Sequence, residues 1–168
     1  MKKRIIALGL LWCLSAVMLQ AARVDTVLVR SAAMNKDVKV VYVLPDKAIG
    51  KQACPVVYLL HGYGGNARSW VQLKPELPQM ADEKGIIFVC PDGKNSWYWD
   101  SPENPAYRYE TFVTSELVKY TDGNYATIPD RKARAISGLS MGGHGALWSA
   151  IRHKDVFGAA GSMSGGVE

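Results

Sequence analysis

The sequence is poor in the residues that hold metal ions and build disulfide frameworks. Its 168 residues include three cysteines and three histidines, no two cysteines form a C-x-x-C pair, and His61, His144 and His153 lack the spacing of metal ligands. Lysine and arginine are not interleaved with aromatic residues, so a nucleic-acid partner is not predicted. Repeats and low-complexity tracts are absent too. With 48% hydrophobic and 21% charged residues, the composition is typical of one globular domain with a sizeable core. No metal or cofactor is predicted.

The N-terminus has the pattern of a secretory signal peptide. Basic residues 2–4 precede an apolar run over 5–19, and the small residues Ala21 and Ala22 follow. The run is short for a membrane span, so removal of residues 1–22 is favoured over a stable membrane anchor, even though the A-x-A match is poor. Removal takes three positive charges and lowers the formal net charge from +5 to +2. The predicted location is secreted or periplasmic.

The remaining cysteines are predicted to stay unpaired. Export permits disulfides, yet the domain predicted over 23–168 has only Cys54 and Cys90. Cys54 precedes the apolar run 55–60, and Cys90 ends the apolar run 86–90. If these runs are neighbouring parallel strands, a rise of about 3.3 Å per residue places the sulfurs roughly 15–20 Å apart, too far for a disulfide. Both thiols are predicted to be buried and free.

Hydrophobic patterning predicts a doubly wound α/β domain with a mostly parallel sheet. Residues 24–31 and 36–45 alternate apolar and polar side chains, as half-buried antiparallel strands do. The continuous apolar runs 55–60 and 86–90 suit central parallel strands covered on both faces. Further helices are predicted over 67–84 (made irregular by Pro75 and Pro78), 107–120 and 142–153, and further strands end at Gly138 and lie within 156–166. This alternation predicts right-handed crossovers, with ligands beyond the carboxyl ends of the strands.

One of those strand ends carries a G-x-S-x-G motif, Gly138-Leu139-Ser140-Met141-Gly142. In a nucleophile elbow the serine occupies a sharp, strained turn between strand and helix, so the positions two residues away must be tiny. Ser140 would then project above the sheet edge, and the Met141 N–H at the start of the helix would be an oxyanion donor. The alternative is a glycine-rich turn with an idle serine, which the flanking strand and helix disfavour.

Two other strand ends carry candidate binding residues. The glycines of 61–65 (HGYGG) let the backbone approach a bound carbonyl, and the Tyr63 N–H is the predicted second oxyanion donor. A tight turn that needs positive φ is the alternative explanation of these glycines. After the next strand, Trp97, Tyr98 and Trp99 either line one wall of the cleft, where aromatic faces suit sugar rings or a phenolic acyl group, or pack the loop. The pattern does not separate these two interpretations.

Three ordered segments, LLHGYGGNARSW, CPDGKNSWYWDSP and AISGLSMGGHGALWSA, together resemble the esterase-D-like branch of the α/β-hydrolase superfamily. That branch includes S-formylglutathione hydrolases, feruloyl and acetyl-xylan esterases, and mycolyltransferases. The resemblance covers nearly all of residues 25–168. It implies an α/β-hydrolase fold, Ser140 as the nucleophile, and Tyr63 and Met141 as backbone oxyanion donors.

The family orders its triad as serine, then an acidic residue, then histidine, and this chain does not complete that order. His144 follows Ser140 by four residues on the helix that the elbow starts, and His153 lies near the far end of that helix, where it is predicted to be exposed. His61 belongs to the second glycine-rich turn and is predicted to order it. None is a good base. The chain is therefore interpreted as the N-terminal part of a longer enzyme, without the C-terminal strands, the acid and the base.

These observations predict an exported serine carboxylic-ester hydrolase that acts through an acyl-enzyme at Ser140. The predicted substrates are acyl or feruloyl esters of polysaccharide. Two alternatives remain open: acyl transfer to a sugar hydroxyl, and a non-catalytic carbohydrate-binding remnant that keeps the aromatic cleft. The 168-residue chain by itself is predicted to be inactive.

Overall fold

The computed structural model describes residues 22–166, so the predicted signal peptide up to residue 21 lies outside the described residues. Within this described part of the chain, six strands form one sheet in the order β1-β2-β4-β3-β5-β6. They are β1 (Arg23–Ser31), β2 (Lys36–Leu44), β3 (Val56–Leu60), β4 (Ile87–Pro91), β5 (Arg134–Leu139) and β6 (Ala159–Met163). β2 pairs antiparallel with β1 and β4, whereas β4, β3, β5 and β6 run parallel. The predicted mostly parallel sheet is confirmed.

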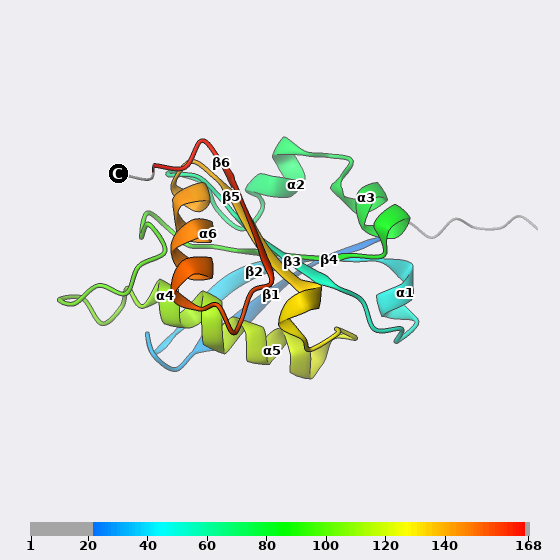
Figure 1. Cartoon of the computed structure of the whole chain (residues 1–168), viewed down its shortest axis with the longest axis horizontal. Coiled ribbons are helices and arrows are strands. Elements are labelled where there is room, and N and C mark those ends of the chain that lie inside the picture. The colour runs from blue at the N-terminus through cyan, green and yellow to red at the C-terminus, as the bar shows by residue number, and fades with distance from the viewer. Residues whose placement is uncertain (1–21, 167–168) are drawn as a thin grey trace, which may run out of the picture.

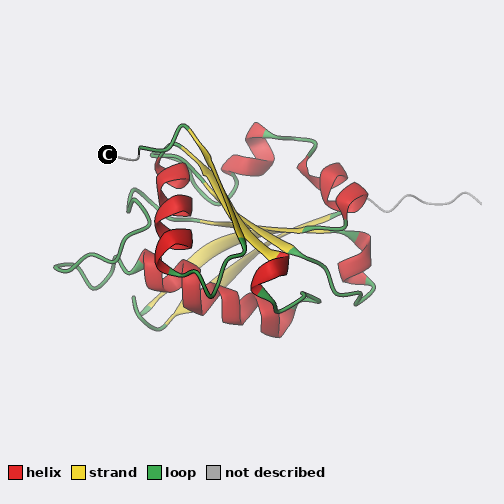
Figure 2. Cartoon of the chain, in the orientation of Figure 1, coloured by secondary structure: helices red, strands yellow, loops and turns green. Residues whose placement is uncertain are grey.

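Helices cover both faces of this sheet (Figures 1 and 2). The helical segments are α1 (Asp46–Ile49), α2 (Ser69–Leu73), α3 (Leu77–Lys84), α4 (Tyr109–Thr111), the π-helix η1 (Phe112–Glu116), α5 (Leu117–Asn124), the 3-10 turn η2 (Arg131–Ala133) and α6 (Met141–Arg152). Helices α2 and α3 lie on one face, and α4, α5 and α6 lie on the other. The helix predicted over 67–84 is interrupted at Pro75, because proline disfavours a helical conformation at the residue before it.

The core has two layers because the central strands bury both of their faces. On β2, Val41 and Val43 belong to the cluster beneath α2 and α3, while Val40 and Tyr42 belong to the cluster beneath α4, α5 and α6. Successive side chains of a strand point to opposite faces, so an uninterrupted apolar run supplies both layers. Each fully buried side chain of this kind contributes about 1.5–3 kcal/mol.

The two cysteines lie at opposite ends of neighbouring parallel strands. Cys54 comes just before β3, and Cys90 lies near the end of β4; both are buried and unpaired. Burial raises the pKa of both thiols. The predicted strand arrangement explains why these side chains do not meet.

The outer strand of the parallel side is less covered than the centre. In β6, Ala159, Ala160 and Met163 are exposed, in contrast to the fully buried strand β4.

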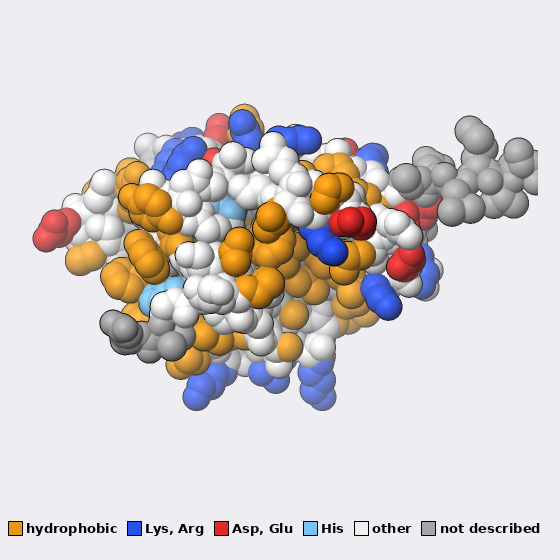
Figure 3. Space-filling view, turned by 90° about the horizontal axis from the view of Figure 1, so that it is seen from above, with side chains coloured by type: hydrophobic (Ala, Val, Ile, Leu, Met, Phe, Trp, Pro, Cys, Tyr) orange, Lys and Arg blue, Asp and Glu red, His pale blue; other side chains and the backbone are white. Residues whose placement is uncertain are grey.

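Seen from above, hydrophobic side chains gather across the middle of the molecule, and Lys and Arg side chains lie nearer its margins (Figure 3).

Candidate active site

The serine predicted as the nucleophile lies in a strained turn between a strand and a helix. Ser140 follows β5 and directly precedes α6, and its φ of 54° and ψ of −119° are values that residues with a side chain rarely adopt. The turn is anchored because the Ser140 N–H donates to the Met163 carbonyl of β6 at 2.8 Å. Ser140 is exposed at the carboxyl edge of the sheet. This is the geometry of a nucleophile elbow.

Glycines two residues before and after Ser140 allow this turn. A Cβ on Gly138 would overlap the Gly142 carbonyl group, and a Cβ on Gly142 would overlap the carbonyl groups of Leu60 and His61. The start of α6 therefore packs backbone against backbone on the ends of β3 and β5. The predicted need for tiny residues at both positions is confirmed.

The second glycine-rich turn lies beside the elbow. A Cβ built on Gly62 would stand 3.6 Å from the Cβ of Ser140, so the turns after β3 and β5 meet at one edge, as expected for parallel strands. The loop after β4 holds the turn in place, because Asn95 Oδ1 accepts the Gly64 N–H at 2.8 Å. Three strand ends thus converge on Ser140.

Both residues predicted as oxyanion donors lie where these strand ends meet. Tyr63 lies between the two turn glycines, and its side chain is 66% exposed. Met141 is the first residue of α6, and its side chain is fully buried. The N–H groups of the first helical turn have no carbonyl partner within the helix, so the Met141 N–H is free of the helix ladder.

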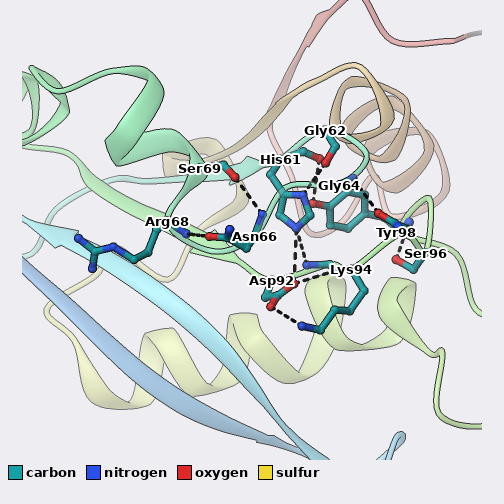
Figure 4. A network of polar contacts seen from close by, with 12 residues as sticks. His61, Gly62, Gly64, Asn66, Arg68, Ser69, Asp92, Lys94, Ser96 and Tyr98 are labelled. Atoms are coloured by element: carbon teal, nitrogen blue, oxygen red, sulfur yellow. Dashed lines mark hydrogen bonds and ion pairs between the residues drawn. The ribbon is translucent and has the colours of Figure 1, made fainter.

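His61 orders the loops beneath the elbow (Figure 4). Its side chain is fully buried, its Nε2 accepts the Gly93 N–H at 2.9 Å, and its Nδ1–H donates to the Gly62 carbonyl at 2.7 Å. Both ring nitrogens are therefore used in joining the loop after β3 to the loop after β4. The prediction that His61 orders its turn is confirmed.

Asp92 is held ionised beside this histidine. His61 Nε2 lies 3.7 Å from Asp92 Oδ1, but it accepts the Gly93 N–H and so has no proton to donate there. Burial alone would raise the pKa of Asp92, and it is outweighed by the neighbouring His61 side chain together with the bonds from the Lys94 N–H at 3.0 Å and Nζ at 2.9 Å. The net effect is a pKa below the ordinary aspartate value.

Tyr98, one of the candidates for lining the cleft, packs inside the loop instead. Its ring is fully buried, with its Oη–H donating to the His61 carbonyl at 3.2 Å. The ring fills the space beside Gly93 and Gly145, where any Cβ would overlap it. Both Tyr98 and its neighbour Trp97 have positive φ, 60° and 55°. This backbone conformation directs the Tyr98 ring into the interior. Of the two interpretations, loop packing describes this residue.

The two tryptophans of the same loop remain accessible. Trp97 is 40% exposed and Trp99 is 45% exposed. Both pack on the ring of His144, with centroids 5.6 and 5.5 Å apart. His144 Nε2 accepts the Trp99 indole N–H at 2.9 Å, and its Nδ1–H donates to the Gly166 carbonyl at 2.7 Å. His144 thus supports the aromatic loop, a role that its place in the sequence did not predict.

A groove of about 680 Å³ runs along α6 and is lined in part by this aromatic cluster. Its lining residues are Trp99, Asp100, Glu110, His144, Leu147, Trp148, Ile151, Arg152 and Gly166. At one end, Glu110 accepts from the Trp148 indole and from Arg152 Nε, each at 2.8 Å. Sequence reasoning missed Glu110. The available signal was a carboxylate directly beside the apolar face that includes Tyr109 and Val113.

His153 is also bound to Glu110 rather than exposed, which corrects its predicted state. His153 Nε2 lies 2.8 Å from Glu110 Oε1, and the side chain is 32% exposed. Burial would raise the pKa of Glu110, but the hydrogen bonds from Trp148, Arg152 and His153 outweigh it and lower the pKa. Within residues 22–166, each of the three histidines therefore bonds elsewhere, and none donates to or accepts from the Ser140 hydroxyl.

A mostly parallel sheet, helices on both of its faces, and a strained serine between a strand and the helix that follows define an α/β-hydrolase with a serine nucleophile elbow. The Esterase family model matches residues 31–168. The chain belongs to this family, and its likeness to serine esterases and acyltransferases confirms the predicted branch of the superfamily.

Three similar proteins illustrate the range of that family. The acetyl esterase of Caldicellulosiruptor saccharolyticus is 28% identical over 135 residues, covering 76% of this chain and 50% of that protein. The diacylglycerol acyltransferase/mycolyltransferase Ag85A of Mycobacterium gordonae is 34% identical over 151 residues, covering 84% of this chain and 42% of that protein. The structure of a ferulic acid esterase superposes with a TM-score of 0.76 and 31% identity, covering 87% of this chain and 61% of that one.

This chain spans about half the length of the curated relatives that it matches. Among residues 22–166, no helix is both long and apolar enough to cross a bilayer. In the same part of the chain, no three histidine, cysteine or acidic side chains gather as a metal site would require.

Proposed function

We propose that the protein is an exported serine carboxylic-ester hydrolase that acts through an acyl-enzyme at Ser140. The observation that carries this proposal is the strained, exposed turn of Ser140 at the start of α6. Backbone strain of about 1–3 kcal/mol persists only where the surrounding structure enforces it, and such positions cluster at active sites. Here the enforcing contacts are the close packing of Gly138 and Gly142 on neighbouring backbone.

In the proposed reaction, Ser140 Oγ bonds to the ester carbonyl carbon, the carbonyl oxygen becomes an oxyanion, and the alcohol leaves with a proton. Water then attacks the acyl-enzyme, releases the acid and restores the hydroxyl. The N–H groups of Tyr63 and Met141 bind the oxyanion in both steps. This assignment is supported by the turn at Gly62, whose Cβ position is 3.6 Å from the Ser140 Cβ. One such donor is typically worth about 10²–10³ in rate.

The general base and its acidic partner are proposed to lie outside residues 22–166. This is supported by the ring nitrogens of His61, His144 and His153, all three of which have bonding partners other than Ser140. A serine enzyme without its base loses on the order of 10⁶ in turnover. Residues 22–168 alone are therefore expected to lack ordinary esterase rates.

The proposed substrates are acyl or feruloyl esters of polysaccharide. Support comes from the likeness to an acetyl esterase and a ferulic acid esterase. It comes also from the exposed rings of Trp97 and Trp99 next to the elbow, because flat aromatic faces suit a sugar ring or a phenolic acyl group. Export is supported by the basic, apolar and small-residue order of residues 1–22, and a secreted or periplasmic enzyme would meet such polymers.

Acyl transfer to a sugar hydroxyl is the second candidate, favoured by 34% identity to a mycolyltransferase. Both reactions share the acyl-enzyme and differ in whether water or an alcohol attacks it. Product analysis in the presence of a sugar acceptor separates them: free acid marks hydrolysis, and a new sugar ester marks transfer.

The nucleophile is tested with a fluorophosphonate probe on the full-length protein. We expect one labelled residue, Ser140, with labelling abolished in Ser140→Ala. Ser137→Ala removes a hydroxyl from the same strand, β5, and is expected to leave labelling intact. Labelling that survives Ser140→Ala would refute the assignment, and carbohydrate binding without any labelling or turnover would instead identify a non-catalytic binding protein.

A further inference from the structure

The first described residue, Ala22, is part of the folded domain rather than a remnant of the leader. It is 7% exposed and belongs to the core cluster that includes Val43, Ala81 and Phe88. β1 begins at the next residue and pairs with β2 from its first position. Loss of Ala22 would therefore remove a buried side chain from the layer beneath α3.

The backbone nitrogen of Ala22 meets the carboxylate of Asp82, which forms no ion pair with any residue of the described part of the chain. Asp82 on α3 accepts the Ala22 N–H through Oδ2 at 2.7 Å and the Asp46 N–H through Oδ1 at 2.9 Å. Asp82 is half-buried. Among the ion pairs of residues 22–166, none includes Asp82. A partly desolvated carboxylate that bonds only neutral amide groups would be stabilised further by a nearby positive charge.

We propose that a signal peptidase hydrolyses the Ala21–Ala22 bond and that Asp82 then binds the new α-ammonium group of Ala22. Water adds across the peptide bond, so that Ala21 leaves with a carboxylate and Ala22 keeps the nitrogen as an ammonium. The Ala22 nitrogen, which donates to Asp82 as an amide, then carries a positive charge beside the Asp82 carboxylate. This inference rests on the proposed export, and it moves the boundary of the leader to residue 21.

The competing cleavage site is one residue further on, and the geometry opposes it. Cleavage after Ala22 would place the new ammonium on Arg23, remove a buried residue, and leave Asp82 Oδ2 without the Ala22 donor. Cleavage after Ala21 keeps every one of these contacts and adds a charge-assisted hydrogen bond, which is stronger than a neutral one.

The cleavage site is tested on the full-length protein, expressed with its leader in a host that has a secretory pathway. Mass spectrometry of the exported protein is expected to identify Ala22 as the N-terminal residue. An N-terminus at Arg23 would overturn the inference while leaving export intact. Retention of Met1 on unexported protein would overturn both, and fluorophosphonate labelling of Ser140 separates either result from a failure of the catalytic assignment.

The ammonium site is tested by the reactivity of the N-terminal amine toward acetic anhydride near neutral pH. A neighbouring carboxylate favours the charged ammonium, which does not react, and each pKa unit changes the free-amine fraction about tenfold. Asp82→Asn is therefore expected to speed acetylation of Ala22 by about three- to tenfold. Glu83→Gln removes the same charge from a neighbouring position of α3, where the carboxylate bonds Gln79, and should leave the rate unchanged. Equal rates in Asp82→Asn and the unmodified protein would refute the pairing.

Discussion

Replacing Tyr98 with phenylalanine removes one hydroxyl group from the interior and leaves the ring in place. That hydroxyl donates to the His61 carbonyl at 3.2 Å, and the residue is fully buried. The net contribution of such a bond is about 0.5–1.5 kcal/mol, and an acceptor left unsatisfied adds to the cost. We therefore expect Tyr98→Phe to lower the free energy of unfolding by about 1–2 kcal/mol. Tyr98→Ala also empties the space beside Gly93 and Gly145 and should cost about 3–5 kcal/mol.

Urea unfolding of the full-length protein measures both effects, and an unchanged m-value would show that the difference lies in stability. Tyr63→Phe is the matched control, because it removes the same hydroxyl from a side chain that is 66% exposed, and it is expected to change stability by less than about 0.5 kcal/mol. Ester-hydrolysis kinetics complete the test. A Tyr98→Phe variant with unchanged unfolding free energy but a raised KM would refute the argument, since Tyr98 would then contact substrate.

Three further predictions follow from buried polar groups. Glu110→Gln should lower the free energy of unfolding by about 1–3 kcal/mol in urea titrations, because the amide nitrogen cannot accept a hydrogen bond and the remaining oxygen carries no charge; an unchanged midpoint would contradict the role of this carboxylate. The folded-state pKa of Asp92 is lowered, so its contribution to stability is complete above the unfolded value of about 3.9 and disappears as the pH falls through the folded value. Asp92→Asn should remove that part of the acid dependence, and parallel stability–pH curves for the two proteins would argue against it. Cys54 and Cys90 should remain thiols in the exported protein. A protein mass lower by two hydrogens, restored by treatment with a reductant, would show instead that the two cysteines form a disulfide.

Side-chain identity and spacing were sufficient to predict the features of the fold that depend on local pattern. The continuous apolar runs before His61 and ending at Cys90 indicated strands buried on both faces, and they are the central parallel strands β3 and β4. The elbow was predictable for a related reason. Strand, G-x-S-x-G and helix follow one another within a few residues, and the glycine requirement at Gly138 and Gly142 arises from the local turn itself.

Side-chain partners between segments distant in the sequence were not predictable in the same way. Tyr98 follows a strand end and is flanked by two tryptophans, a pattern that fits a binding wall as well as a packed loop. Its inward direction depends on positive φ at two consecutive residues and on space left by Gly145, a residue 47 positions away in the chain. Likewise, the bond between Glu110 and His153 joins residues 43 positions apart.

The sequence by itself thus determined the class of the fold, the sharp turn at Ser140 and the convergence of the turns at 61–65 and 138–142, because periodicity and glycine placement act over short stretches of chain. Only the tertiary structure decided that Tyr98 is interior, that Glu110 binds both Trp148 and His153, and that Ala22 belongs to the folded domain through Asp82. These contacts depend on where separate elements come to rest against one another. A hydrogen-bond partner 38 to 60 residues away has no signature in the local pattern of either residue.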